Sequence, residues 1–353
     1  MTAWDVAPDH RTVIQAHYGR YHDPLVTSFY DFLDPLSQTP QIVMQVDGTG
    51  QFQELTRFLS ATRYTNDPEA KHSYADEYFV GVEREVRTHL SVRAQYVHRD
   101  FKESLGFIDT GSTWTSVGVI DPGADGTPGT TDDGGPMTVY YNNNATAPSL
   151  VLTNPEGAFR HYNALQAIAT ARDLNGMYLQ ASYTWARTRG SFNNEFSSNA
   201  ANNDLSVNGD FVNPNRALYS IGRTTRDFTH DVKVLATYTL PHWGGVRLSA
   251  VYRYTSGRPW ARVTSVSPLT QLGAVRVEPI GSREFPATNT ADVRVEKTFR
   301  AAGVSTVGVF VNVFNITNQG IPFNVNPGSG PNFGLPIAWV DPRRVRAGVR
   351  VSF

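Results

Sequence analysis

The sequence contains no cysteine among its 353 residues. This absence excludes disulfide-stabilised scaffolds and thiolate metal sites. The chain also lacks a run of about eighteen apolar residues, which excludes a transmembrane helix but not membrane-spanning strands, because strands need only about ten alternating residues. An excess of charge is missing too: 31 basic residues against 32 acidic ones give a net charge of -1. Nucleic acid is therefore not expected as a partner.

The first ten residues, MTAWDVAPDH, have neither the basic region nor the apolar core of a signal peptide. For an exported protein, we therefore expect the sequence to represent a mature segment or the later part of something longer.

Alternating side chains are the main structural signal, and the last eleven residues show it best. Val345, Ala347, Val349, Val351 and Phe353 share one face of an extended strand, while arginines recur on the other. A water-soluble sheet would show the same alternation, so this strand alone does not decide its surroundings.

The pattern recurs upstream at similar length. Ten strands are predicted in all, at 11–21, 77–87, 90–100, 161–172, 177–187, 228–240, 246–255, 291–300, 304–315 and 343–353. Their connections alternate between a few residues, as at Asn175-Gly176, and tens of residues, as at 22–76 and 101–160. Such sorting is typical of an up-and-down sheet with one end in a confined compartment.

The predicted fold is therefore all-β: an antiparallel up-and-down transmembrane β-barrel segment of about ten strands, with short periplasmic turns and long extracellular loops. Aromatic residues gather near the strand ends, where they would form girdles at headgroup depth. A soluble sandwich whose strands end in aromatics is the alternative. The aromatics concerned are Tyr183, Trp185, Phe228, Tyr252, Tyr254, Phe299, Phe314 and Phe353.

Several segments resemble the C-terminal barrel strands of TonB-dependent outer-membrane receptors, in particular the Oar-like group with a carboxypeptidase-regulatory-like domain. They are HYNALQAIATARDLNGMYLQASYTWAR, THDVKVLATYTLPHWGGVRLSAVYRYTSGRPW, TADVRVEKTFR, VFVNVFNITNQ and DPRRVRAGVRVSF. The segments DHRTVIQAHYGRYHDP and DEYFVGVEREV also resemble that group's mid-barrel strands. The resemblance implies a bacterial outer-membrane location and active uptake of a large or scarce nutrient. We expect no enzymatic activity.

The sequence departs from that family because such barrels have 22 strands around a plug. We expect residues 1–353 to form a single C-terminal barrel portion of a fragmentary receptor, without plug domain, TonB box or signal peptide. Contact with the TonB complex would then depend on the missing N-terminal part. Whether ten strands close into a barrel is left open.

The final residue, Phe353, has a separate interpretation. The resemblance to outer-membrane proteins implies that a last strand ending in an aromatic residue is recognised by the barrel-assembly machinery. The simpler alternative is that an apolar residue merely ends an apolar face.

An acidic, glycine-rich stretch is the candidate metal site, with Asp121, Asp125, Asp132 and Asp133 in DPGADGTPGTTDD. Carboxylate oxygens on a flexible backbone suit Ca²⁺. The spacing is not that of an EF-hand but resembles calcium loops of bacterial surface proteins. A solvated loop with no ion is the alternative, and no other cofactor is expected.

No catalytic site is predicted. The nine histidines show no metal-ligand spacing, there is no GxSxG motif, and the glycine-rich 328–334 lacks the residues of a phosphate-binding loop. Strand carboxylates are expected to face a wet lumen and pair with basic residues. These carboxylates are Glu83, Asp231, Asp292 and Glu296, with Arg93, Lys233, Arg294 and Arg350 as candidate partners.

Loop composition gives one indication of a ligand. Residues 137–148 and 188–227 are rich in amide and aromatic side chains, as in Tyr140-Tyr141-Asn142-Asn143-Asn144 and Phe192-Asn193-Asn194-Glu195-Phe196, which suits an oligosaccharide or a peptide. Polar external loops of any kind are the alternative. The second functional class is a non-transporting β-rich cell-surface or adhesive protein, stabilised by calcium.

Overall fold

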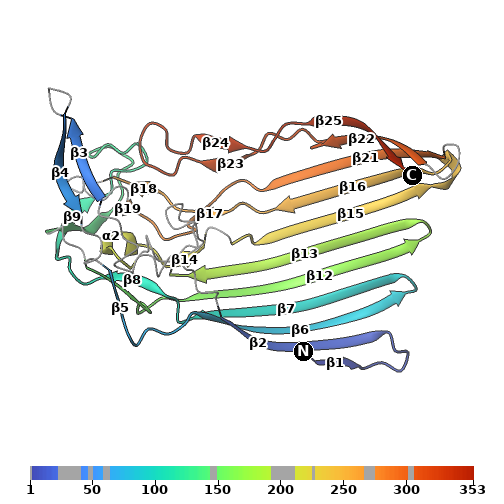
Figure 1. The fold of residues 1–353 in the computed structure, drawn as a ribbon, viewed down its shortest axis with the longest axis horizontal. Coiled ribbons are helices and arrows are strands. Elements are labelled where there is room, and N and C mark those ends of the chain that lie inside the picture. The colour runs from blue at the N-terminus through green and yellow to red at the C-terminus, as the bar shows by residue number, and fades with distance from the viewer. Residues whose placement is uncertain are drawn as a thin grey trace.

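A computed structural model describes residues 2–22, 41–46, 51–58, 64–143, 149–191, 211–224, 227–265, 275–300 and 306–353. Its regular secondary structure is almost entirely β-strand, joined into one large antiparallel sheet and several small ones (Figure 1). None of the helices in these ranges combines the length and hydropathy needed to span a bilayer.

The main sheet follows the chain in order, and each strand pairs with the next member of the path. Its members are β1 (Thr2–Asp5), β2 (Thr12–His22), β6 (Tyr74–Arg87), β7 (Leu90–Lys102), β12 (Arg160–Leu174), β13 (Met177–Gly190), β15 (His230–Leu240), β16 (Val246–Thr255), β21 (Thr288–Arg300), β22 (Thr306–Phe314) and β25 (Arg344–Ser352), with β14 (Gly222–Arg223) beside β13. All ten predicted strands are confirmed, and β1 is an addition.

Short turns lie at one end of the sheet, and long loops project from the other (Figure 1). At the turn between β12 and β13, Asn175 and Gly176 have φ of 54° and 79°, as expected for a tight hairpin. Within the described residues no pairing joins β1 to β25, so the sheet has two open edges. The described strands therefore form an open sheet and do not close into a barrel on their own.

The long loops carry secondary structure of their own. Their elements are β3 (Gln41–Val46), β4 (Phe52–Phe58), β5 (Tyr64–Asn66), β8 (Gly106–Asp109), β9 (Trp114–Ile120), β10 (Pro136–Asn142), β11 (Leu150–Thr153), α2 (Pro214–Ala217), β17 (Pro259–Trp260), β18 (Val263–Thr264), β19 (Val275–Arg276), β20 (Arg283–Glu284), β23 (Pro322–Val325) and β24 (Pro336–Trp339); the 3₁₀ helix η2 (Pro241–Trp243) lies in a short turn.

Two buried apolar clusters lie among these loops. Phe107 packs against Leu152, and Val139 packs against Met137 and Val275. Val139 and Val275 come from loops that precede β12 and follow β16, so one cluster joins distant loops. Burial of each large side chain contributes about 1.5–3 kcal/mol, which favours an ordered loop region over separate mobile loops.

The main sheet itself has two unlike faces. One carries mainly exposed apolar side chains and is called the apolar face; the side chains between them, including Arg350 and Glu296, define the polar face. A large exposed apolar surface indicates contact with a membrane or a partner. Its exposed members include Val80, Val82, Val92, Leu165, Leu248, Tyr252, Val295, Val309, Val311, Val345, Val349 and Val351.

Candidate functional site

Ion pairs within strands and between neighbouring strands line the polar face. Arg93 Nε donates to Glu83 Oε2 at 2.9 Å between β7 and β6. On β15, Lys233 Nζ lies 2.8 Å from Asp231 Oδ1. These contacts confirm the expected pairing of strand carboxylates with basic residues, and they give the face a hydrophilic surface.

Glu296 on β21 is the most enclosed carboxylate of this face, with 4% of the residue exposed. It accepts hydrogen bonds from Arg294 Nη2 at 2.8 Å and from Arg350 Nη2 at 2.7 Å. The Arg294 guanidinium also lies 3.8 Å from the centre of the Phe310 ring. The contacts tie β21 to β22 and to the terminal strand β25. Asp292, by contrast, accepts the backbone amide of Asn315 at 2.8 Å.

An aromatic row crosses the apolar face toward the loop end. Tyr18 and Tyr78 are paired across β2 and β6, with ring centroids 5.1 Å apart. Tyr183 and Tyr252 are exposed on the same face farther along the sheet. The row matches the girdle expected where strands leave the hydrocarbon layer.

Two aromatic residues expected in a girdle are placed differently. Phe314 alternates with the apolar-face residue Val313 on β22, so it belongs to the polar face and lies opposite Arg344. Phe228 precedes β15 and lines a cavity at the loop end of the sheet. Proximity to a strand end therefore did not determine which face an aromatic residue occupies.

Beyond the aromatic row, the apolar face becomes charged. Asp76 lies 2.8 Å from Arg20 and 3.3 Å from Lys102, and Lys102 lies 3.2 Å from Asp100. On β6 the apolar stretch runs between Arg84 and Asp76. Their separation of eight residues is about 26 Å along the strand, at about 3.3 Å per residue. Strand tilt shortens this to about 20 Å, close to the apolar band of a membrane barrel.

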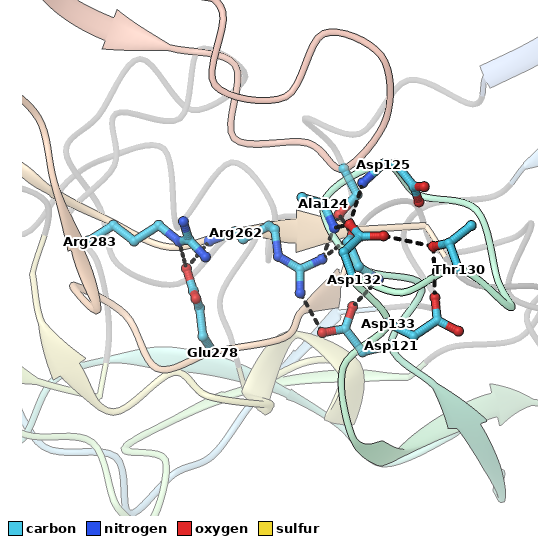
Figure 2. A network of polar contacts seen from close by, with 11 residues as sticks. Asp121, Ala124, Asp125, Thr130, Asp132, Asp133, Arg262, Glu278 and Arg283 are labelled. Carbon is cyan, nitrogen blue, oxygen red and sulfur yellow. Dashed lines mark hydrogen bonds and ion pairs between the residues drawn. The ribbon is translucent and has the colours of Figure 1, made fainter.

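The acidic loop is held by its own backbone amides (Figure 2). Asp132 Oδ2 accepts the amides of Ala124 at 2.6 Å and Asp125 at 3.1 Å, and Asp132 Oδ1 accepts the Thr130 hydroxyl at 2.7 Å. The Thr130 hydroxyl and these amides lower the pKa of the Asp132 carboxyl from its usual 3.8. Asp133 Oδ2 accepts the amide of Gly129 at 2.7 Å. The ionised carboxylates thus order the loop.

Asp121 has a different partner from the other three. Its carboxylate accepts from the Arg262 guanidinium, and both side chains are about nine-tenths buried. Arg262 Nη1 also donates to the Ser329 hydroxyl at 2.8 Å, and Ser329 Oγ donates to the carbonyl of Gly123 at 2.8 Å. Three loops therefore meet at one guanidinium. We call this contact the Arg262 junction.

The Arg262 junction was not predicted from the sequence. Asp121 and Arg262 are separated by 141 positions, and a single arginine in a loop gives no local signal. The glycine-rich 328–334 is a loop, as expected, and it contributes Ser329 and Gly330 to this contact. Gly330 donates its amide to the carbonyl of Ala124 at 2.9 Å.

Calcium binding by the acidic loop remains a prediction. Asp125 accepts the amide of Thr127 at 2.7 Å, so each of the four carboxylates already accepts a hydrogen bond. In the part of the chain that the structure describes, no group of three or more His, Asp or Glu side chains is arranged to hold a metal ion. The observed role of the loop carboxylates is hydrogen bonding and ion pairing.

The amide- and aromatic-rich loop segments are only partly described. Tyr140, Tyr141 and Asn142 belong to β10, where the Tyr140 amide donates to Asn215 Oδ1 at 2.7 Å. Asn144 and the segment 192–196 lie outside the described residues. The described part thus contributes to loop packing, and the ligand interpretation stays a prediction.

A single antiparallel up-and-down sheet with an apolar face, a charged face, an aromatic row and long loops at one end defines a bacterial outer-membrane β-barrel wall. The chain belongs to the outer membrane beta barrel domain family, whose model matches residues 2–275. Its place in the bacterial outer membrane follows from that membership.

The chain is 24% identical over 338 residues to the TonB-dependent transporter Oar of Myxococcus xanthus, covering 81% of this chain and 29% of that protein. It therefore spans less than a third of that relative. The crystal structure of the outer-membrane transporter YddB from Escherichia coli has the same fold, with a TM-score of 0.60 at 10% identity, covering 98% of this chain and 39% of that one. These relatives are transporters rather than enzymes.

Proposed function

We propose that the chain forms part of the wall of a TonB-dependent outer-membrane transporter that takes up a large or scarce nutrient, with oligosaccharides and peptides as candidates. The charged polar face carries this proposal, because a transport lumen must be wetted. Its pairs, such as Arg93 with Glu83 and Lys233 with Asp231, extend over several strands. The similarity to Oar over 81% of the chain supports it.

The proposed transporter has three further partners: outer-membrane lipid, the TonB complex and the barrel-assembly machinery. Outer-membrane lipid covers the apolar face. The TonB complex acts through parts of the receptor other than these strands. The barrel-assembly machinery recognises the last strand through Phe353, which is 98% exposed and lies just beyond β25.

Comparison of cells with and without the gene tests transport. Both strains are grown on mixed oligosaccharides and peptides as scarce nutrients, and depletion of each compound from the medium is followed by mass spectrometry. The expected result is slower depletion of one compound class in the deletion strain, and loss of the difference when a protonophore removes the energy source. A non-transporting surface protein would leave depletion unchanged and alter only adhesion.

A further inference from the structure

A cavity of about 430 Å³ opens at the loop end of β16 and β21, on the polar face. Arg253 and Thr290 come from these strands, and Phe285 and Phe323 come from the two loops above. The cavity therefore lies where strand wall and loops meet. Its volume suits a small organic molecule or the end of a longer one.

The apolar side of the cavity is closely packed. Phe285 stacks on Trp260 with centroids 5.6 Å apart and planes 20° apart, and Trp260 also contacts Phe333 at 6.0 Å. Gly257 lies against the backbone of Phe285, since a Cβ there would come 1.6 Å from the Phe285 carbonyl oxygen. The ring of Phe285 is thus already packed on Trp260 in the absence of a ligand, and such packing lowers the entropic cost of binding.

Two guanidinium groups supply the polar side. Arg253 Nη2 lies 3.6 Å from Asp231 Oδ2, within ion-pair range but beyond hydrogen-bond distance, while Lys233 pairs with Asp231 Oδ1 at 2.8 Å. Arg258 donates to the carbonyl of Phe323 at 3.4 Å, a long contact, and its guanidinium lies 5.5 Å from the centre of the Phe285 ring. No carboxylate is among the described residues that line the cavity.

We propose that this cavity binds an organic carboxylate with an aromatic or large apolar body, the carboxylate against Arg253 and Arg258 and the body against Phe285 and Phe323. Arginine suits carboxylates because its fork can donate two parallel hydrogen bonds. The proposal rests on the proposed transport function and narrows the substrate: a peptide with an apolar C-terminal residue or a free aromatic acid fits, whereas a neutral oligosaccharide does not.

Calorimetric titration of the complete polypeptide, extracted from outer membranes in detergent, tests the ligand class without requiring transport. The ligands are 2-naphthoate and its amide, N-acetyl-Phe-Phe and its C-terminal amide, and maltoheptaose. We expect each acid to bind about tenfold more tightly than its amide, the difference that a charge-assisted hydrogen bond typically makes. Tighter binding of naphthoate would indicate a free aromatic acid as the ligand, and tighter binding of N-acetyl-Phe-Phe would indicate a peptide C-terminus.

Arg258→Ala and Arg253→Ala are each expected to reduce acid binding about tenfold. Arg247→Ala is the matched control, because Arg247 lies on the same face of β16 at the turn end, outside the cavity. Arg258→Lys, which keeps the charge, should retain part of the affinity if the alanine variant fails to fold.

Equal binding of acids and amides would overturn the proposal, as would undiminished binding in the arginine variants or tightest binding of maltoheptaose. None of these results would affect the transport function, which the depletion experiment tests separately.

Discussion

At the scale of single residues, ion pairs that involve arginines of β25 differ in how far they are buried. Glu296 is nearly buried between Arg294 and Arg350, whereas the pair of Asp341 with Arg344 at 3.2 Å is exposed on both sides. Buried charged groups are costly when a partner is lost, and exposed pairs contribute little. Both pairs include an arginine of β25, so they form a matched comparison of a buried and an exposed ion pair.

The change Glu296→Gln should lower the free energy of unfolding by about 1–3 kcal/mol, because two guanidinium groups lose their counter-charge while the shape is kept. Urea unfolding of the polypeptide in lipid vesicles, followed by tryptophan fluorescence, measures the change. The control Asp341→Asn should cost less than about 1 kcal/mol. Equal effects of the two changes would contradict a structural role for Glu296.

Asp132 offers a second test at this scale, because the native chain has no cysteine and a single spin label can be attached at Thr131→Cys. The folded-state pKa of Asp132 lies below its unfolded value of 3.8. Its contribution to loop order is therefore fully present above about pH 3.8 and is lost as pH falls through the lower, folded pKa. Label mobility, read by electron paramagnetic resonance, should rise in that range.

The Asp132→Asn variant should show the mobile spectrum at every pH.

Because backbone amides satisfy the carboxylates, removal of calcium with a chelator should leave the spectrum of the labelled chain unchanged at neutral pH. A chelator-dependent gain in mobility would instead favour the calcium site expected from the sequence.

At the scale of elements, local pattern was enough for the strands of the main sheet. Period-two alternation over about ten residues identifies a strand with two unlike faces, and it located the strands from β2 to β25. It missed β1 (Thr2–Asp5), which has four residues and forms by pairing with β2. The two-residue strands β17 (Pro259–Trp260) and β20 (Arg283–Glu284) are also too short to show a period-two pattern.

The candidate sites also differ in whether local sequence is enough to predict their contacts. The partners of Glu83 and Asp231 lie on the same or an adjacent strand, so strand order and alternation were enough to predict them. The Arg262 junction depends on how three loops fold over one another, which no local pattern encodes. The cavity beside Arg253 and Arg258 depends on the same loop packing.

At the scale of the whole molecule, the Arg262 junction and the Val139 cluster join loops from distant parts of the chain, so we expect these loops to open as one unit. Arg262→Ala would leave Asp121 buried without its partner, at a local cost of about 3–5 kcal/mol. On intact cells, proteinase K should then cut the loops around 121–135 and 326–335 together and faster than in the native protein, while the strands remain folded and heat-modifiable on gels.

Lys71→Ala is the control for that experiment, because Lys71 belongs to an exposed loop pair with Glu103 at 3.6 Å and its loss should change cleavage little. If only one of the two loops became sensitive in the Arg262 variant, the loops would be independent of one another.

The last prediction concerns assembly of the barrel. A change at Phe353 can separate an effect on assembly from an effect on stability. Its side chain is 98% exposed, so Phe353→Ala removes little packing and should change the free energy of unfolding by no more than about 0.5 kcal/mol. If the aromatic end is the assembly signal, the amount of folded protein in outer membranes should nevertheless fall several-fold. Ser352→Ala, one position earlier, should leave that amount unchanged. A fall in unfolding free energy that matches the fall in amount would assign Phe353 to packing, because an unstable barrel is degraded whether or not it is recognised.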